Sequence, residues 1–81
     1  MDNYKIKKAN ELYSKIQGAQ WAKDKMLEYE HYERAKEVSQ KINQWYKEIK
    51  GLKLTEEERE KVGYEFIDND LAEKYYWSLR A

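Results

Sequence analysis

The sequence contains no cysteine and no proline, and its 81 residues include only three glycines and one phenylalanine. Without cysteine the fold has no disulfide to stabilise it, and the redox compartment cannot be read from the chain. A chain of this length buries only about 60–65% of its extended surface, so a monomer would be marginally stable. The absence of proline leaves glycine and capping residues as the signals that end helices. The chain is therefore one domain at most, and few of its residues force a helix to end.

Net charge and long apolar runs are also missing. Sixteen basic residues balance sixteen acidic ones, which argues against a dedicated nucleic-acid binder. No run approaches the roughly 18 apolar residues of a membrane span, and the N-terminus has no apolar signal region, so we expect a cytoplasmic protein. The charges are nevertheless uneven, at +3 over residues 1–25 and −3 over residues 51–81. The two ends are expected to attract each other within one chain or between chains.

What is present favours helix throughout, because 40% of the residues are charged and most of these are good helix formers. We predict three helices, near 3–17, 19–50 and 55–80. The first has apolar residues at Ile6, Ala9, Tyr13 and Ile16, at helical spacing. Gly18 either ends this helix or lies inside a longer one.

The second predicted helix carries the strongest pattern. Apolar residues step by 3, 4, 3, 4, 3, which is a heptad stripe. A single helix over 19–50 would be about 48 Å long and would overhang a monomer whose radius of gyration is about 12 Å. We therefore expect a homodimer, with the stripe as a dimer or core contact and Gly51 as the helix end. The stripe consists of Ala35, Val38, Ile42, Trp45, Ile49 and Leu52.

The clearest local signal is a capping box in which Thr55 caps a helix and Glu58 reaches back to the Thr55 amide. Gly63 and the segment 68–70 are weak points of the helix that follows.

The predicted fold is all-α, a three-helix antiparallel bundle with a long central second helix against which the third packs. The alternative is a continuous 3–50 helix in an elongated coiled-coil dimer.

Twelve aromatic residues (eight Tyr, three Trp and one Phe) are a surplus for so small a core. Tyr and Trp combine an apolar body with a polar tip, and they are enriched where proteins meet partners. Adjacent aromatics such as Trp45-Tyr46 and Tyr76-Trp77 cannot share one helix face, because successive residues lie about 100° apart. We therefore predict a partner interface formed by Trp21, Tyr46, Tyr76 and Trp77.

Catalytic and metal-binding patterns are sparse. Glu28 and His31 have the Glu-x-x-His spacing of di-metal helical bundles, but a second helix would have to supply a bridging glutamate. We expect these two side chains at the rim, with Ala22, Met26, Tyr29 and Tyr32 facing inward. The single histidine and the scattered hydroxyls form no nucleophile site. The prediction is a non-enzyme without metal or cofactor.

We therefore expect a protein that binds a protein partner and regulates or inhibits it. One alternative is a nucleic-acid or nucleotide-binding oligomer that uses Tyr4, Lys5, Lys7 and Lys8, since bases stack on aromatic rings while lysines contact phosphates. Another is a purely structural oligomerisation piece. In composition the chain is similar to small accessory proteins of phages and other mobile elements, many of which bind a host factor. That resemblance implies an inhibitor in the host cytoplasm.

Overall fold

The computed structural model describes residues 4–61 and 67–80, and its regular structure there is entirely helical. The all-α prediction is confirmed, but these residues form four helices rather than three. The predicted boundary at 17–19 is wrong, whereas the predicted break between 50 and 55 is confirmed to within one residue. The helices are α1 (Tyr4–Glu28), α2 (Tyr32–Gly51), α3 (Glu56–Lys61) and α4 (Asn69–Arg80).

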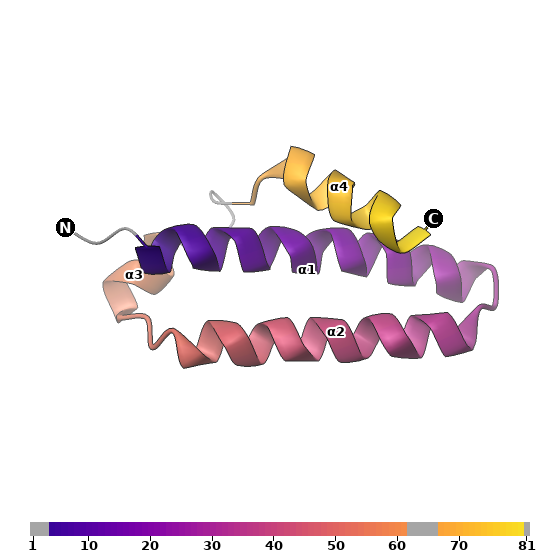
Figure 1. The fold of residues 1–81 in the computed structure, drawn as a ribbon, viewed down its shortest axis with the longest axis horizontal. Helices are drawn as coiled ribbons and strands as arrows, with labels where there is room; N and C mark the ends of the chain where they lie inside the picture. The colour runs from indigo at the N-terminus through magenta and orange to yellow at the C-terminus, as the bar shows by residue number, and fades with distance from the viewer. Residues whose placement is uncertain (1–3, 62–66, 81) are drawn as a thin grey trace.

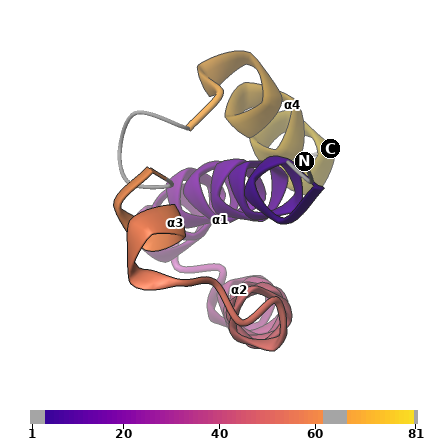
Figure 2. The same ribbon diagram turned by 90° about the vertical axis from the view of Figure 1, so that its left-hand side faces the viewer.

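The central element is α1, which packs against α2 on one side and against α4 on the other. Figure 1 shows α2 folded back antiparallel to α1, while α4 runs in the same direction as α1. Viewed from the end, the three helices form a stack with α1 in the middle (Figure 2). The prediction that the third helix packs on a central second helix is therefore wrong. The stack is elongated, with extents of 45 × 22 × 17 Å.

The sequence of α1 suits a helix that is buried on two opposite faces. Leu12 and Ile16 face α2 within the main core, whereas Ser14 and Gly18 face α4. Residues two apart on a helix are separated by about 200°, which places these two pairs on opposite sides. The α4 face carries small residues, and there the backbones nearly touch. A Cβ on Gly18 would collide with the Ala72 carbonyl oxygen and lie 3.0 Å from the Tyr76 nitrogen.

The heptad stripe of α2 faces α1 within the same chain. Ala35, Val38, Ile42 and Ile49 are buried, and Trp45 and Leu52 pack against them at the edge. Their partners on α1 follow the same helical spacing, so one continuous core runs between the two helices. These partners are Ala9, Leu12, Ile16, Ala19, Ala22 and Met26.

The break between α1 and α2 lies at Glu30 and not at Gly18. Glu30 adopts a left-handed conformation with φ of 61°. Its amide donates to the Leu27 carbonyl at 3.1 Å, and the His31 amide donates to the Met26 carbonyl at 2.7 Å. These two bonds form a Schellman motif, which ends a helix and is usually built on glycine. Because no glycine stands at this position, no sequence pattern predicts the turn.

This turn removes one reason for expecting a dimer. The predicted 48 Å helix over 19–50 does not form, and neither does the alternative continuous helix over 3–50. The stripe is covered by α1 instead of by a second copy. The homodimer stays a prediction that now depends on the exposed aromatic residues alone.

Capping residues define the last two helices. The capping box before α3 is confirmed, since the Thr55 amide donates to Glu58 Oε1 at 3.0 Å and the Glu58 amide donates to Thr55 Oγ1 at 3.1 Å. The helix predicted over 55–80 is divided at its predicted weak point at 68–70, because Asp68 lies outside any helix and its carboxylate accepts from the Asp70 and Leu71 amides at the start of α4. The Asp68 amide itself donates to the buried Ser14 hydroxyl at 2.9 Å, which fastens α4 to α1. The predicted weak point at Gly63 lies outside the described residues.

Candidate interaction groove

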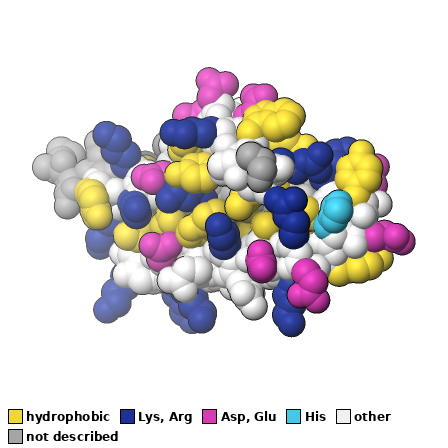
Figure 3. Space-filling view, turned by 45° about the vertical axis from the view of Figure 1, so that its right-hand side comes forward, with side chains coloured by type: hydrophobic (Ala, Val, Ile, Leu, Met, Phe, Trp, Pro, Cys, Tyr) yellow, Lys and Arg dark blue, Asp and Glu magenta, His cyan; other side chains and the backbone are white. Residues whose placement is uncertain are grey.

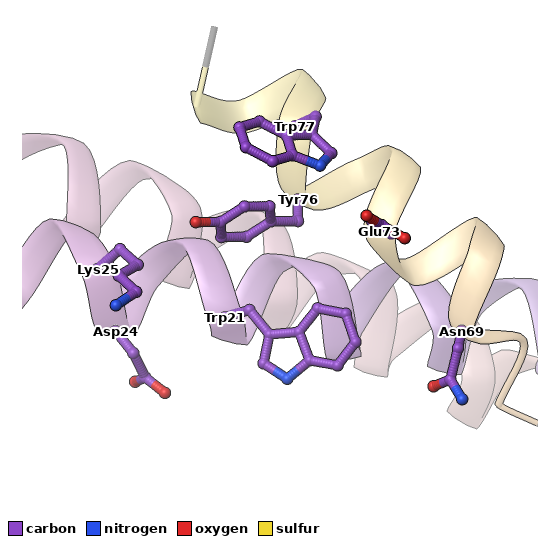
Figure 4. A pocket seen from close by; sticks show the side chains of 7 residues that line it. All are labelled: Trp21, Asp24, Lys25, Asn69, Glu73, Tyr76 and Trp77. Carbon is purple, nitrogen blue, oxygen red and sulfur yellow. The ribbon is translucent and has the colours of Figure 1, made fainter.

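A hollow with a volume of about 490 Å³ lies between α1 and α4. Three of the four residues predicted to form a partner interface line it, and in the view of Figure 4 the ring of Tyr76 lies between those of Trp77 and Trp21. We call this hollow the aromatic groove. It is lined by Trp21, Asp24 and Lys25 of α1 and by Asn69, Glu73, Tyr76 and Trp77 of α4.

The close approach of the two backbones explains why large rings remain uncovered here. Gly18 and Ala72 bring α1 and α4 together without side chains between them. Rings on the neighbouring turns cannot enter so narrow a contact, so they lie along its edge. Trp21 is 36% exposed and Trp77 is 60% exposed, whereas Tyr76 packs partly against the core.

Two rings of the groove, Tyr76 and Trp77, contact each other on α4. Tyr76 and Trp77 meet edge to face, with ring centroids 5.0 Å apart and ring planes at 78°. The Arg80 guanidinium carbon lies 5.7 Å from the Tyr76 centroid and 5.9 Å from that of Tyr29, a cation–π geometry. Arg80 thus links the groove to the turn between α1 and α2.

The charged residues of the groove are mainly acidic. Asp24 and Glu73 come from opposite walls, and in the described part of the chain neither has an ion-pair partner within 4.0 Å. Lys25 is paired, since its Nζ lies 3.3 Å from Glu28 Oε2. The groove therefore combines exposed indoles with two carboxylates that have no basic partner there.

Tyr46, the fourth residue of the predicted interface, lies elsewhere. It is 45% exposed on α2 and borders a second hollow of about 360 Å³ near α3. The structure thus brings Trp21, Tyr76 and Trp77 together and leaves Tyr46 apart. The second hollow is lined by Tyr13, Tyr46, Ile49, Lys50, Leu54 and Arg59.

A third exposed apolar group surrounds the turn between α1 and α2. Leu27, Tyr29 and Tyr32 are 42%, 59% and 62% exposed. Figure 3 brings this end forward and shows hydrophobic surface interspersed with side chains of both charges. The expectation that Tyr29 and Tyr32 face inward is wrong, because the chain reverses between them and carries both outside the α1–α2 core. Sequence periodicity could not show this without the position of the turn.

Lys15 joins the three long helices at one point. Its Nζ lies 5.9 Å from the Trp45 centroid of α2, 5.2 Å from the Tyr75 centroid of α4 and 3.4 Å from Glu11 Oε1. Burial lowers the pKa of the Lys15 ammonium, but the charges of Tyr75 and Glu11 and their hydrogen bonds outweigh it. The pKa therefore lies above that of an ordinary lysine. No sequence pattern marked Lys15, since only the tertiary fold supplies its partners.

The predicted nucleic-acid cluster lies on the first turn of α1. Tyr4, Lys5 and Lys7 are exposed and Lys8 is half-buried. The cluster is about 20–25 Å along the helix axis from Trp21, at 1.5 Å per residue. It is thus separate from the aromatic groove.

Glu28 and His31 are both exposed, on either side of the turn. Among residues 4–61 and 67–80, no group of three or more metal-ligating side chains is close enough to hold an ion. In the same part of the chain, no helix is both long enough and hydrophobic enough to cross a membrane. Comparisons with protein-family models, with curated proteins and with solved structures found no match to this chain.

Proposed function

We propose that this chain is a small non-enzymatic interaction module that binds a protein partner through the aromatic groove and thereby regulates or inhibits it. One observation carries the proposal: two helices distant in sequence place Trp21, Tyr76 and Trp77 around a single open hollow. Aromatic residues in such a setting are those that most often dominate the binding energy of protein interfaces. Regulation would follow from occupancy, because binding covers a surface of the partner.

The exposed indoles are a substantial source of binding energy. Covering the accessible parts of Trp21 and Trp77 would contribute on the order of 5 kcal/mol at about 25 cal/mol per Å². A dissociation constant of 1 mM already corresponds to about 4 kcal/mol, and association has its own entropic cost. The indoles alone therefore support weak binding, and a specific complex needs further contacts beside them.

Site-directed photo-crosslinking tests the proposal in the cells that encode the protein. Asn69 lines the groove, so Asn69→p-benzoylphenylalanine places the reactive group at its edge. The control is the same substitution at Glu37, which is exposed on α2. We expect one dominant covalent protein adduct from position 69 that is absent from position 37.

The double variant W21A/W77A then tests whether the rings are responsible. We expect the adduct at position 69 to fall at least tenfold while helicity by circular dichroism is retained. Tyr76 is left unchanged because it packs partly against the core. The same adducts from both positions, or an adduct unaffected by W21A/W77A, would contradict the proposal.

A further inference from the structure

The chemistry of the groove specifies more than an apolar partner. Glu73 extends from α4 and Asp24 from α1, and in Figure 4 the rings of Trp21 and Tyr76 lie between the two carboxylates. The basic residue of the lining, Lys25, is already paired with Glu28. A ligand in the groove therefore meets two acidic groups, one on each wall, with exposed rings between them.

Cations of this chain already lie over other aromatic rings, including Tyr76 of the groove. Lys15 lies over Trp45 and Tyr75, and Arg80 lies over Tyr29 and Tyr76. Within the described residues no lysine or arginine lies over Trp21 or Trp77. Indole is the side chain that attracts cations most strongly through its ring face. The two most exposed rings of the groove thus remain available for a cation supplied from outside.

We infer that the aromatic groove binds a basic segment of the partner protein, in which an arginine or lysine side chain lies against Trp21 and Trp77 and pairs with Asp24 or Glu73. This inference rests on the proposed function and adds the chemistry of the partner. Charge complementarity selects the occupant, since an acidic segment would bring carboxylates against Asp24 and Glu73. Covering the indoles alone supports only weak binding. Ion pairs and cation–π contacts supply the additional binding energy.

The size of the groove agrees with a short helical segment. Its α4 wall runs from Asn69 to Trp77, which is about 12 Å at 1.5 Å per residue. Two turns of a ligand helix cover about 11 Å. A helix of that length presents residues i, i+3, i+4 and i+7 on one face, enough for apolar anchors flanked by basic residues.

Two synthetic peptides test the inference. Both are 14-residue amphipathic helices with identical leucine positions, and their polar positions are all arginine in one and all glutamate in the other. Isothermal titration at 150 mM salt measures binding to the full chain. We expect the arginine peptide to bind at least tenfold more tightly than the glutamate peptide, and D24N/E73Q to weaken the arginine peptide about tenfold.

The matched control is E37Q/E48Q, which removes the same number of charges from exposed positions on α2. We expect it to bind the arginine peptide within twofold of the parent, so a general effect of net charge is separated from the groove. Equal binding of the two peptides, no binding of either, or an unchanged affinity in D24N/E73Q would overturn the inference. If the peptides give one of these results while the crosslink at position 69 is still lost in W21A/W77A, the proposed function stands and only the basic partner is refuted. Absence of the crosslink from the parent protein would refute the proposed function itself.

Discussion

At the residue scale, Gly18 decides how closely α1 and α4 approach. Its missing side chain leaves room for the backbone of α4, where the Ala72 carbonyl carbon would lie 2.9 Å from an added Cβ. Backbone atoms at a helix contact cannot rotate away as a flexible side chain can. The position therefore needs glycine for space and not for its conformational freedom.

Gly18→Ala is expected to destabilise the protein by up to about 2 kcal/mol, because overpacking costs about 1–3 kcal/mol and the gain in helix propensity offsets only about 1 kcal/mol of it. Urea unfolding measures the change. The control is Gly51→Ala, where an added Cβ meets nothing within 4 Å and a gain of up to about 1 kcal/mol is expected. Equal effects at the two positions would show that α4 does not dock on Gly18.

Lys15 is the second decisive residue, and its contribution depends on pH. Because its pKa is raised in the folded state, its stabilising effect is complete below the unfolded pKa of about 10.4 and is lost as the pH rises through the folded value. We expect Lys15→Met to cost about 1 kcal/mol at pH 8, and this cost should fall once the pH passes the folded pKa of Lys15. Urea midpoints of parent and variant, compared over a pH series from 8 upward, cancel the ionisation of other tyrosines. A cost that does not fall at the alkaline end of the series would contradict this assignment.

At the element scale, the left-handed residues at the helix ends are not the glycines. Glu30 and Lys53 have φ values of 61° and 53°, whereas Gly18 lies inside α1 and Gly51, the predicted end of α2, is its last residue without a positive φ. Both left-handed positions are thus occupied by residues with a Cβ, which this backbone conformation disfavours. The turn after Glu28 forms because α1 and α2 gain a common core by folding back.

Replacing Glu30 with glycine should therefore stabilise the protein by about 1 kcal/mol, since the left-handed conformation disfavours a Cβ. The control is Glu30→Ala, which removes the same charge but keeps the Cβ, and for which no gain is expected. Thermal unfolding by circular dichroism compares the two. A gain of the same size in Glu30→Ala would assign the effect to charge instead of backbone conformation.

At the scale of the whole molecule, the core between α1 and α2 lies within one chain. Twelve aromatic residues suggested that part of the apolar surface needs a partner, and Trp77 and Tyr32 remain at least 60% exposed beside that core. Self-association, if it occurs, would have to use such exposed groups. The heptad stripe is not available for it.

Ile42→Ala is expected to lower the free energy of unfolding by about 2–4 kcal/mol, as for other buried isoleucines. Because the core is intramolecular, the loss should be the same at low and high protein concentration. Melting temperatures over a hundredfold range of concentration check this. A parent whose melting temperature rises with concentration, and an Ile42→Ala variant whose melting temperature does not, would place the stripe between chains.

The sequence by itself determined the helical class, the buried stripe of α2, the capping box at Thr55 and Glu58, and three of the residues that gather in the aromatic groove. These depend on periodicity and on contacts between residues three or four apart, which a chain displays locally. Only the tertiary structure decided that Gly18 is a close contact, that Glu30 turns the chain, and that α1 rather than α2 is central. The two carboxylates of the groove, Asp24 and Glu73, lie 49 residues apart in the sequence, and the ring partners of Lys15 lie 30 and 60 residues from it. Their meeting depends on which faces pack together, and that is a property of the whole fold.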